Sequence, residues 1–298
     1  MTELTGRRCA VITGASSGIG LATAKILANQ GWDIIAHGRD AARSEVAEAE
    51  IRLVATGGAR VDMLRCDLSL LADTARLAKE IAGLTPRVDA LVNNAGGVRS
   101  SMIITQEGNE VTFASNHLGH FLLTRELLPL LRATAAAYGA GAARVVSVSS
   151  FGHAHAPAID WDDLQGIRNW VSTRNYCSAK LYNVLFTREL ARRTGPDGIV
   201  ANAMHPGSVA SNFINHGTPE HRERDKAHEA DRLPPEISAG TIAWLASAAE
   251  TGRVTGKYFF DYEEEEMSAA AQDDLSAARL WEASEKLLAR ESSVEFPA

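Results

Sequence analysis

A glycine-rich turn between an apolar segment and a helix-like segment is the feature that most constrains the fold of this chain. Residues 9–13 are mostly apolar, residues 13–20 read Thr-Gly-Ala-Ser-Ser-Gly-Ile-Gly, and residues 21–30 have the composition of a helix. A second apolar run follows at residues 33–36. This order predicts a strand, a sharp turn, a helix and a second, parallel strand, which together form a β-α-β unit.

The same alternation of apolar runs and helical patterns continues along the 298 residues. Further strands are expected at residues 61–65, 90–93, 144–149, 199–204 and 257–260. Further helices are expected at residues 44–55, 71–82, 109–131, 176–193 and 274–288. We therefore predict one α/β domain over residues 1–298, a Rossmann fold whose doubly wound, seven-stranded parallel sheet is flanked by helices. Ligands of such sheets bind beyond the carboxyl ends of the strands.

Three segments depart from this alternation. Residues 151–174 and 208–235 are long and polar, and we expect both to be loops over the carboxyl edge of the sheet. We interpret residues 208–235 as a substrate lid. Residues 262–298 form a C-terminal extension that includes the acidic run 263–266, which we interpret as a solvated face.

The composition limits the partners and the compartment. The formal net charge of −7 disfavours nucleic acid as a partner, because phosphate backbones are bound by clustered basic residues. We expect neither a signal peptide nor a membrane span, since charged residues and a proline interrupt the most apolar helical stretch. Three cysteines without metal-site spacing indicate reduced thiols, and we expect a cytoplasmic protein.

The glycine-rich turn predicts a site for a dinucleotide. Glycine allows a sharp turn and a close approach of the backbone, so a pyrophosphate would sit above residues 18–21 at the helix N-terminus. The GxxxGxG spacing is weak evidence alone, because such turns also close α/β units that bind no cofactor. A nucleotide-binding P-loop is unlike this turn, since Gly20 is followed by Leu21 and Ala22 instead of Lys and Ser or Thr.

The end of the second strand indicates which dinucleotide is preferred. An acid that would bind the adenosine ribose is replaced by Gly38, and Arg39 follows. A guanidinium binds phosphate with several planar donors, so we expect NADP(H) to be preferred over NAD(H), with Arg39 on the 2′-phosphate. In the alternative, Arg39 is a solvated surface residue and His37 or Asp40 meets the ribose.

Tyr176 and Lys180 follow in a helical pattern with i,i+4 spacing, which places phenol and ammonium on one helix face. A free phenol has a pKa near 10, and a cation about 4 Å away is worth roughly 4 kcal/mol at an effective dielectric of 20. We therefore expect Lys180 to lower the pKa of Tyr176 by up to about three units.

Together with these residues, the chain carries the motifs of a known family. They are residues 13–20, 93–96, Asn116, Ser149 and Ser150, Tyr176 with Lys180, and Pro206 with Gly207. Through them the chain resembles the short-chain dehydrogenase/reductase family over some two thirds of its length. Residues 116–124, 146–150 and 182–190 look like those of retinol-dehydrogenase-type and related oxidoreductases. The separation of Ser150 and Tyr176 is longer than is common in the family, and a similar insertion occurs in that branch.

The resemblance implies four catalytic residues. Tyr176 would donate or accept the substrate proton, Lys180 would lower its pKa and hold the nicotinamide ribose, and Ser150 would bind the carbonyl oxygen. Asn116 would complete a water-mediated relay to Lys180. Adjacent residues on a strand point to opposite faces, so one of Ser149 and Ser150 faces the substrate, and the family pattern favours Ser150.

The resemblance also implies the residues that bind the cofactor. These are Gly14, Ser16, Ser17, Gly18, Ile19 and Gly20 in the turn, Arg39, Asp67 and Leu68 at the adenine, Asn94, Ala95 and Gly96 at the adenine ribose, Pro206, Gly207 and Val209 at the nicotinamide with Tyr176 and Lys180, and Ser211 at a phosphate or the carboxamide. For Asp67 the alternative is a helix N-cap, although Ser69 is the better-placed cap.

These observations predict an NADP(H)-dependent oxidoreductase that interconverts a carbonyl and an alcohol. The alternatives are a non-catalytic dinucleotide-binding redox sensor or scaffold, and a membrane-bound lipid-alcohol dehydrogenase. Large apolar side chains in the loops, such as Trp161, Trp170, Phe213 and Ile214, suggest a sizeable, partly apolar small-molecule substrate. Family members pair through their long helices, which implies a homodimer or homotetramer. We expect no metal and assign no role to the histidines, including His117, His120, His153 and His155.

Overall fold

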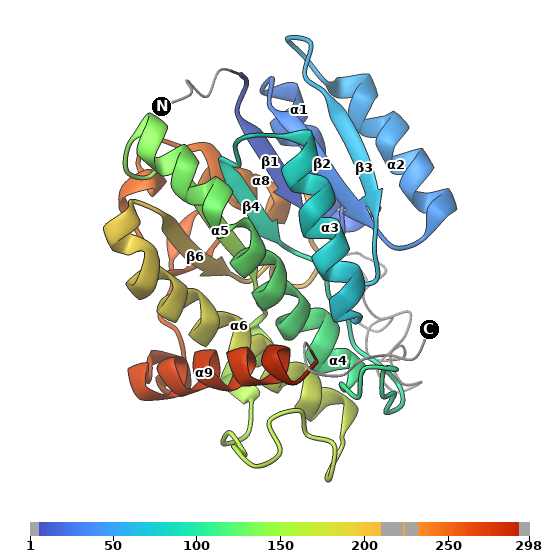
Figure 1. Cartoon of the computed structure of the whole chain (residues 1–298), viewed down its shortest axis with the longest axis vertical. Coiled ribbons are helices and arrows are strands. Elements are labelled where there is room, and N and C mark those ends of the chain that lie inside the picture. Colours follow the sequence, from blue (N-terminus) through green and yellow to red (C-terminus); the bar gives the residue numbers. More distant parts are fainter. Residues whose placement is uncertain (1–5, 210–222, 224–231, 292–298) are drawn as a thin grey trace.

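The computed structural model describes residues 6–209, 223 and 232–291, and its centre is an eight-stranded sheet (Figure 1). The strands lie in the order β3-β2-β1-β4-β5-β6-β7-β8, and every neighbouring pair is parallel except β7 and β8. They are β1 (Cys9–Ile12), β2 (Asp33–Gly38), β3 (Val61–Arg65), β4 (Ala90–Asn93), β5 (Arg144–Val148), β6 (Val200–Met204), β7 (Tyr258–Phe260) and β8 (Glu263–Glu264). The predicted parallel sheet is confirmed, and β8 is an addition made of two glutamates, which carry no apolar signal.

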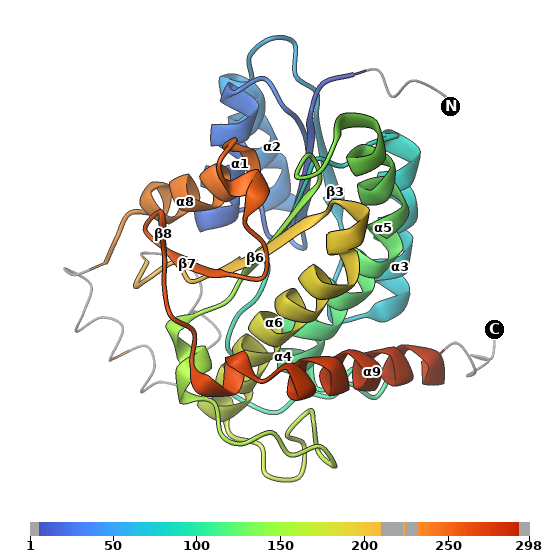
Figure 2. The same cartoon turned by 90° about the vertical axis from the view of Figure 1, so that its left-hand side faces the viewer.

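Helices cover both faces of the sheet (Figure 2). One face carries α1 (Gly18–Asn29), α2 (Ala41–Val54) and α8 (Pro235–Ser247), and the other carries α3 (Leu71–Leu84), α5 (Gly119–Tyr138) and α6 (Ser172–Thr194). The C-terminal α9 (Asp274–Glu291) packs against α6 on the side away from the sheet. Among the described residues, no helix has the length and apolar character needed to cross a membrane.

The pleat of the strands divides the core into two apolar clusters. In β1, Val11 belongs to the cluster under α3, α5 and α6, whereas Ala10 and Ile12 belong to the cluster under α1 and α8. In β4, Leu91 and Val92 divide in the same way. Strands that are apolar on both faces are expected of a parallel sheet covered by helices, which is why the short apolar runs were readable from sequence.

The helix expected over residues 109–131 differs in its bounds and its geometry. It begins with α4 (Val111–Phe113), widens into the π-helical segment Ala114–Leu118, and continues as α5 to Tyr138. Gly119 lies where the helix meets the end of β3, and a Cβ there would be 2.3 Å from the carbonyl oxygen of Leu68. A larger residue would push the helix away from the edge where the polar residues gather.

Of the two segments expected as loops, residues 151–174 are described in full and residues 208–235 only in part. Residues 151–155 form a short 3-10 helix, and α6 begins at Ser172, one turn before its expected start. Most of the expected lid, residues 208–235, lies outside the described residues, and so does Ser211.

Candidate active site

One cleft at the carboxyl edge of the sheet brings together most of the residues expected to bind a cofactor or to react. Its volume is about 440 Å³. The strand ends of β1, β2, β3, β4, β5 and β6 all contribute to it, as predicted for ligands of such sheets. Among its lining residues are Gly14, Ser16, Ser17, Gly18, Ile19, Gly20, Arg39, Asp67, Leu68, Asn94, Ala95, Gly96, Ser150, Tyr176, Lys180, Pro206, Gly207 and Val209.

The glycine-rich turn is held tightly against β4. Gly14 and Gly18 have φ of +68° and +54°, a backbone conformation that residues with side chains rarely adopt. A Cβ on Gly20 would lie 2.4 Å from the carbonyl oxygen of Gly14 and 2.5 Å from Nδ2 of Asn94. Asn94 Nδ2 also donates to the carbonyl oxygen of Thr13 over 2.8 Å. The turn therefore has room for backbone only.

The N-terminus of α1 opens into this cleft and is chemically suited to phosphate. Within residues 17–29, Ser17 is the N-cap but its side chain makes no capping hydrogen bond, and the first turn contains no acidic residue. By contrast, Asp40 caps α2 by accepting from the backbone N–H of Arg43 over 2.9 Å. Unpaired N–H groups and the helix dipole favour an anion at the first turn of α1, so the residues present fit a pyrophosphate.

His37 supports the turn from behind. Its Nδ1 accepts from the backbone N–H of Gly14 over 3.2 Å, and its Nε2 lies 2.9 Å from the carbonyl oxygen of Cys66. Because Nδ1 accepts, the ring proton is on Nε2 and points to Cys66. Burial lowers the pKa of His37, which keeps the ring neutral. With both nitrogens engaged by backbone, His37 is poorly suited to the alternative role of binding the ribose.

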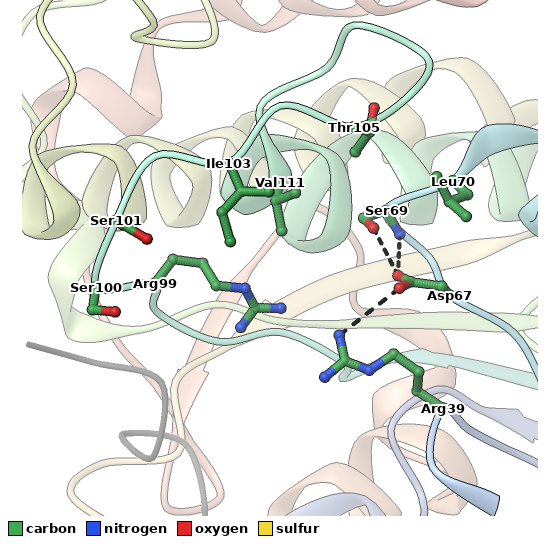
Figure 3. A pocket seen from close by; sticks show the side chains of 10 residues that line it. All are labelled: Arg39, Asp67, Ser69, Leu70, Arg99, Ser100, Ser101, Ile103, Thr105 and Val111. Carbon is green, nitrogen blue, oxygen red and sulfur yellow. Dashed lines mark hydrogen bonds and ion pairs between the residues drawn. The ribbon is translucent and has the colours of Figure 1, made fainter.

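A second hollow of about 520 Å³ adjoins the cleft at Arg39 and Asp67 (Figure 3). Arg39 Nη1 lies 3.9 Å from Oδ2 of Asp67, which also accepts from the N–H and hydroxyl of Ser69 through Oδ1. The side chain of Arg99 extends toward these residues from the loop after β4 and lines both spaces. Burial lowers the pKa of Arg99, and the nearby cation Arg39 lowers it further.

Sequence reasoning missed Arg99 as a site residue. Its guanidinium makes no hydrogen bond or ion pair with another residue in the described part of the chain, although it is partly buried. Arg43 lines the cleft as well, but it lies 3.5 Å from its partner Asp40. The sequence offers one indication of this role, which is that Arg99 follows Gly96 closely. The backbone after Gly96 has to cross the carboxyl ends of the strands, so the residues on it lie near the cleft.

Neither of the two residues considered as caps of α3 has that role. The N-cap residue is Leu70, and neither Ser69 nor Asp67 caps the helix with its side chain. The carboxylate of Glu107, from a distant loop, accepts from the backbone N–H groups of Leu71 and Ala72 over 2.6 and 3.0 Å. A long-range acceptor has displaced the local one, and this frees Asp67 to face the cleft and Arg39.

Ser149 and Ser150 face in opposite directions, as the alternation along a strand predicts. Ser149 is buried, and its Oγ donates to the carbonyl oxygen of Lys180 over 2.7 Å. The Oγ of Ser150 accepts from the backbone N–H of Gly152 over 3.0 Å and is hydrogen-bonded to Tyr176. The side chain beside the phenol is therefore that of Ser150.

The expected effect of Lys180 on Tyr176 is not what the structure shows. Burial raises the pKa of Tyr176, and the hydrogen bond with Ser150 opposes this only in part. Burial also lowers the pKa of Lys180 to about 8. Its Nζ donates to the carbonyl oxygen of Val148 over 3.1 Å and lies 5.6 Å from the centre of the Tyr176 ring. Charge and spacing alone would lower the pKa of Tyr176, but the loss of hydration on burial disfavours the charged form of each group.

Asn116 lies behind the cleft, in the π-helical segment. It is fully buried, its Nδ2 donates to the carbonyl oxygens of Gly97 and Thr112, and its Oδ1 accepts from the N–H of Gly97. A Cβ on Gly96 would lie 2.4 Å from Oδ1 of Asn116 and 3.3 Å from Nζ of Lys180. Asn116 and Lys180 thus meet at Gly96, and the water-mediated relay between them stays a prediction.

The tryptophans of the 151–174 segment serve as anchors. Trp170 Nε1 donates to the carboxylate of Glu110 over 3.1 Å, and the Arg279 guanidinium lies 4.4 Å from the centre of the Trp161 ring. Neither tryptophan belongs to the described residues that line the cleft. Phe213 and Ile214 lie outside the described residues. These four loop residues therefore supply no direct support for an apolar substrate.

Comparison with known proteins places these features in a family. The family model described as short chain dehydrogenase matches residues 8–222. Human retinol dehydrogenase 13 is 37% identical over 289 residues, which cover 95% of this chain and 85% of that protein. Mouse retinol dehydrogenase 14 is 36% identical over 290 residues, which cover 93% and 85%.

Solved structures agree with this assignment. An uncharacterized protein of Mycobacterium paratuberculosis matches with a TM-score of 0.72 and 31% identity, covering 98% of this chain and 95% of that one. The Pseudomonas aeruginosa RhlG/NADP complex matches with a TM-score of 0.67 and 27% identity, covering 87% and 97%. On the fold, the glycine-rich turn and the coverage of these matches, the chain belongs to the short-chain dehydrogenase family of oxidoreductases and is retinol-dehydrogenase-like.

Proposed function

We propose that this protein is an NADP(H)-dependent oxidoreductase that interconverts a ketone or aldehyde and an alcohol. The observation that carries the proposal is one cleft that is lined both by the uncapped N-terminus of α1 and by Ser150, Tyr176 and Lys180. A dinucleotide whose pyrophosphate lies at α1 would extend along this cleft toward the phenol. The family membership supports the same reaction class.

When bound, the nicotinamide supplies or accepts the hydride at the substrate carbon. The protein's part concerns the substrate oxygen, which gains negative charge as hydride reaches the carbon. The hydroxyl of Ser150 and the phenol of Tyr176 donate hydrogen bonds to that oxygen, and Tyr176 then gives it a proton. The raised pKa of Tyr176 keeps the phenol protonated for reduction, and Lys180 returns a proton to the phenolate. In oxidation, Tyr176 first passes its phenolic proton to neutral Lys180 and then, as the phenolate, accepts the alcohol proton.

The proposed preference for NADP(H) rests on the cations at the adenosine end. Arg39, Arg43 and Arg99 line the cleft there, and the first two are close to Asp67 and Asp40. A 2′-phosphate carries close to two negative charges at neutral pH, so it needs cationic donors beyond those already paired. Arg99 is well suited because it has no carboxylate partner among the described residues. The RhlG structure is an NADP complex, which supports the same class of cofactor.

The proposed substrate is a small molecule with a sizeable apolar part. The supporting observations are the names of the retinol dehydrogenase relatives and the apolar side chains exposed at, or next in sequence to, residues that line the cleft or the second hollow. These include Met102 and Ile103 on the loop after β4 and Phe151 after β5. Retinoids and other apolar aldehydes are therefore the first substrates to test.

We propose one domain in the cytoplasm, with α9 controlling assembly. Pairing through α5 and α6 is implied by the resemblance, but α9 lies on these helices: Trp281 packs 4.8 Å from Phe121 and 5.9 Å from Phe186, measured between ring centres. His117 Nε2 lies 3.0 Å from the hydroxyl of Ser284. A dimer through this face would require α9 to move away. We therefore propose that α9, in the position described, prevents pairing through α5 and α6.

The test is turnover with a panel of carbonyl compounds and NADPH. Wild-type protein should oxidise NADPH when a suitable aldehyde or ketone is present, and Tyr176→Phe should abolish turnover while NADPH binding remains. Binding without turnover on a broad panel that includes retinal would favour the non-catalytic sensor or scaffold. Absence of dinucleotide binding in the wild type would refute the proposal altogether.

A further inference from the structure

The acidic run that was interpreted as a solvated face is divided between two environments. Glu264 in β8 points outward, where its carboxylate accepts from Nζ of the exposed Lys257 over 2.7 Å. Glu265 is the next residue, and its backbone N–H donates to the carbonyl oxygen of Tyr258 over 2.8 Å, which extends the pairing of β7 and β8. Its side chain turns the other way, because successive side chains alternate across a strand. There the carboxylate meets a buried histidine.

That histidine is His205, which immediately precedes the Pro206 and Gly207 turn at the cleft. Its Nε2 lies 2.7 Å from Oε2 of Glu265, and its Nδ1 accepts from the backbone N–H of Gly207 over 3.2 Å. An N–H can only donate, so Nδ1 carries no proton and the Nε2 proton points to Glu265. The carboxylate therefore fixes both the tautomer and the direction of the ring.

The rings around His205 remove its remaining freedom. It stacks on Phe260 with ring centres 4.4 Å apart and planes 8° apart, and Tyr258 stacks at 5.6 Å. Gly207 has φ of +72°, and a Cβ on it would lie 3.1 Å from the Phe260 ring. The turn is thus held between a hydrogen bond from one side and an aromatic wall from the other.

The same C-terminal segment reaches Ser150 through a second histidine. The backbone N–H of Ser268 donates to Nε2 of His153 over 3.2 Å, so the ring proton is on Nδ1. That Nδ1 lies 2.9 Å from the carbonyl oxygen of Ser150 and 3.2 Å from the hydroxyl of Tyr258. Burial lowers the pKa of His153, which keeps this arrangement neutral. Two histidines to which sequence reasoning gave no role thus connect residues 265–268 with the two ends of the reaction site.

We propose that residues 265–268 position the reaction site, with Glu265 orienting the Gly207 turn through His205 and the N–H of Ser268 orienting Ser150 through His153. The inference rests on the proposed function, in which Ser150 holds the substrate oxygen, and on the nicotinamide role of Pro206 and Gly207 that the family resemblance implies. It makes these residues positioning residues, since neither Glu265 nor Ser268 lines the described cleft. We call the contacts from Glu265 through His205 to Gly207 the first arm, and those from Ser268 through His153 to Ser150 the second arm. The first arm should affect dinucleotide binding and the second the chemical step.

The first arm is tested by dinucleotide binding in the full-length protein. Glu265→Ala should raise the Kd for NADPH, measured by fluorescence titration, by about five- to tenfold, because the charge-assisted hydrogen bond that keeps the proton on Nε2 and leaves Nδ1 as the acceptor for Gly207 is lost. Glu265→Gln keeps an acceptor for Nε2 and should recover at least half of that loss on a logarithmic scale. Glu264→Ala, the neighbour that faces Lys257, should bind as the wild type does.

The second arm is tested by kcat. Ser268→Pro replaces the N–H by a ring carbon, and the φ of −57° at Ser268 is one that proline adopts. It should lower kcat with less effect on the Kd for NADPH, whereas Ser268→Ala, which keeps the N–H, should leave both unchanged. If a substitution only destabilises the fold, a smaller fraction of the protein is folded and the apparent kcat falls. The Kd of the folded protein for NADPH then stays at the wild-type value.

The outcomes separate this inference from the proposed function. If the wild type binds NADPH and Glu265→Ala binds it equally well, the positioning role is wrong and the proposed function stands. A Glu265→Gln variant as weak as Glu265→Ala would also overturn the hydrogen-bond role. If the wild type binds no dinucleotide, it is the proposed function that fails. Thermal unfolding of each variant confirms that folded protein is compared.

Discussion

The hydroxyl of Ser149 donates to the backbone carbonyl oxygen of Lys180 over 2.7 Å and so ties the end of β5 to the middle of α6. The neighbouring residue, Ser150, is left to face Tyr176. Ser149 therefore holds the end of β5 close to α6. This brings Ser150 within reach of Tyr176 on that helix.

The two serines should respond differently to removal of the hydroxyl. Ser149→Ala should lower the free energy of unfolding by about 1 kcal/mol, the worth of one buried hydrogen bond, and retain most of the turnover. Ser150→Ala also loses the hydrogen bond that its hydroxyl accepts from the N–H of Gly152, but it should in addition lower kcat by about 100-fold or more, since it removes a donor to the developing oxyanion. Urea unfolding and steady-state kinetics measure the two quantities. Equal kinetic losses would contradict the division of roles.

Arg39→Ala and Arg99→Ala should each lower kcat/KM for NADPH by about 10- to 100-fold, with little change for NADH, because a guanidinium on a phosphate makes charge-assisted hydrogen bonds. The control is Arg132→Ala, which changes the net charge equally but removes a surface partner of Asp197. If Arg99→Ala affects NADPH and NADH alike, Arg99 does not contact the 2′-phosphate.

Gly20→Ala should abolish measurable dinucleotide binding and destabilise the protein by about 1–3 kcal/mol, because the added Cβ would overlap Gly14 and Asn94. Gly83 in α3 is the matched control, since a Cβ there meets no atom within 4 Å. Gly83→Ala should raise the free energy of unfolding by about 0.5–1 kcal/mol through helix propensity. Calorimetry and NADPH titration distinguish the two outcomes.

Trp281→Ala should destabilise the protein by about 3–5 kcal/mol, because this nearly buried ring packs between Phe121, Phe186 and the guanidinium of Arg193. Loosening α9 should also uncover the apolar faces of α5 and α6 and promote association. Light scattering at increasing concentration would detect it. A variant that stays at the wild-type mass would show that α9 does not control pairing through this face.

Two buried histidines should make stability fall in mild acid. Burial lowers the pKa of His117 and of His120 from 6.5 to about 3 in the folded protein. Below pH 6.5 these histidines are protonated in the unfolded chain but stay neutral in the folded protein. Their contribution to the free energy of unfolding, which is complete above pH 6.5, is therefore lost as the pH falls toward 3. The slope reaches about 1.4 kcal/mol per pH unit for each histidine.

Urea unfolding between pH 7 and 5, where most carboxylates stay ionised, measures this slope. His117→Gln should reduce the slope by the contribution of one proton, about 1.4 kcal/mol per pH unit. An unchanged slope in His117→Gln would mean that this ring is protonated in the folded state.

The sequence by itself determined the features that are local in the chain. The order of apolar runs defined seven strands because strands covered by helices are apolar on both faces. The spacing of Gly14, Gly18 and Gly20 defined the phosphate turn because a backbone conformation and a close approach both require glycine. The i,i+4 spacing of Tyr176 and Lys180 placed both on one face of α6 because helical geometry is periodic.

Only the tertiary structure decided features that depend on residues far apart or on burial. Glu107 caps α3 from 36 positions away, and Glu265 meets His205 across 60 positions, so no local pattern announces either contact. The pKa of Tyr176 rises instead of falling because folding removes water from the phenol, and burial separately lowers the pKa of Lys180. Spacing along the chain places groups near one another, but the energy of a charge depends on everything that surrounds it.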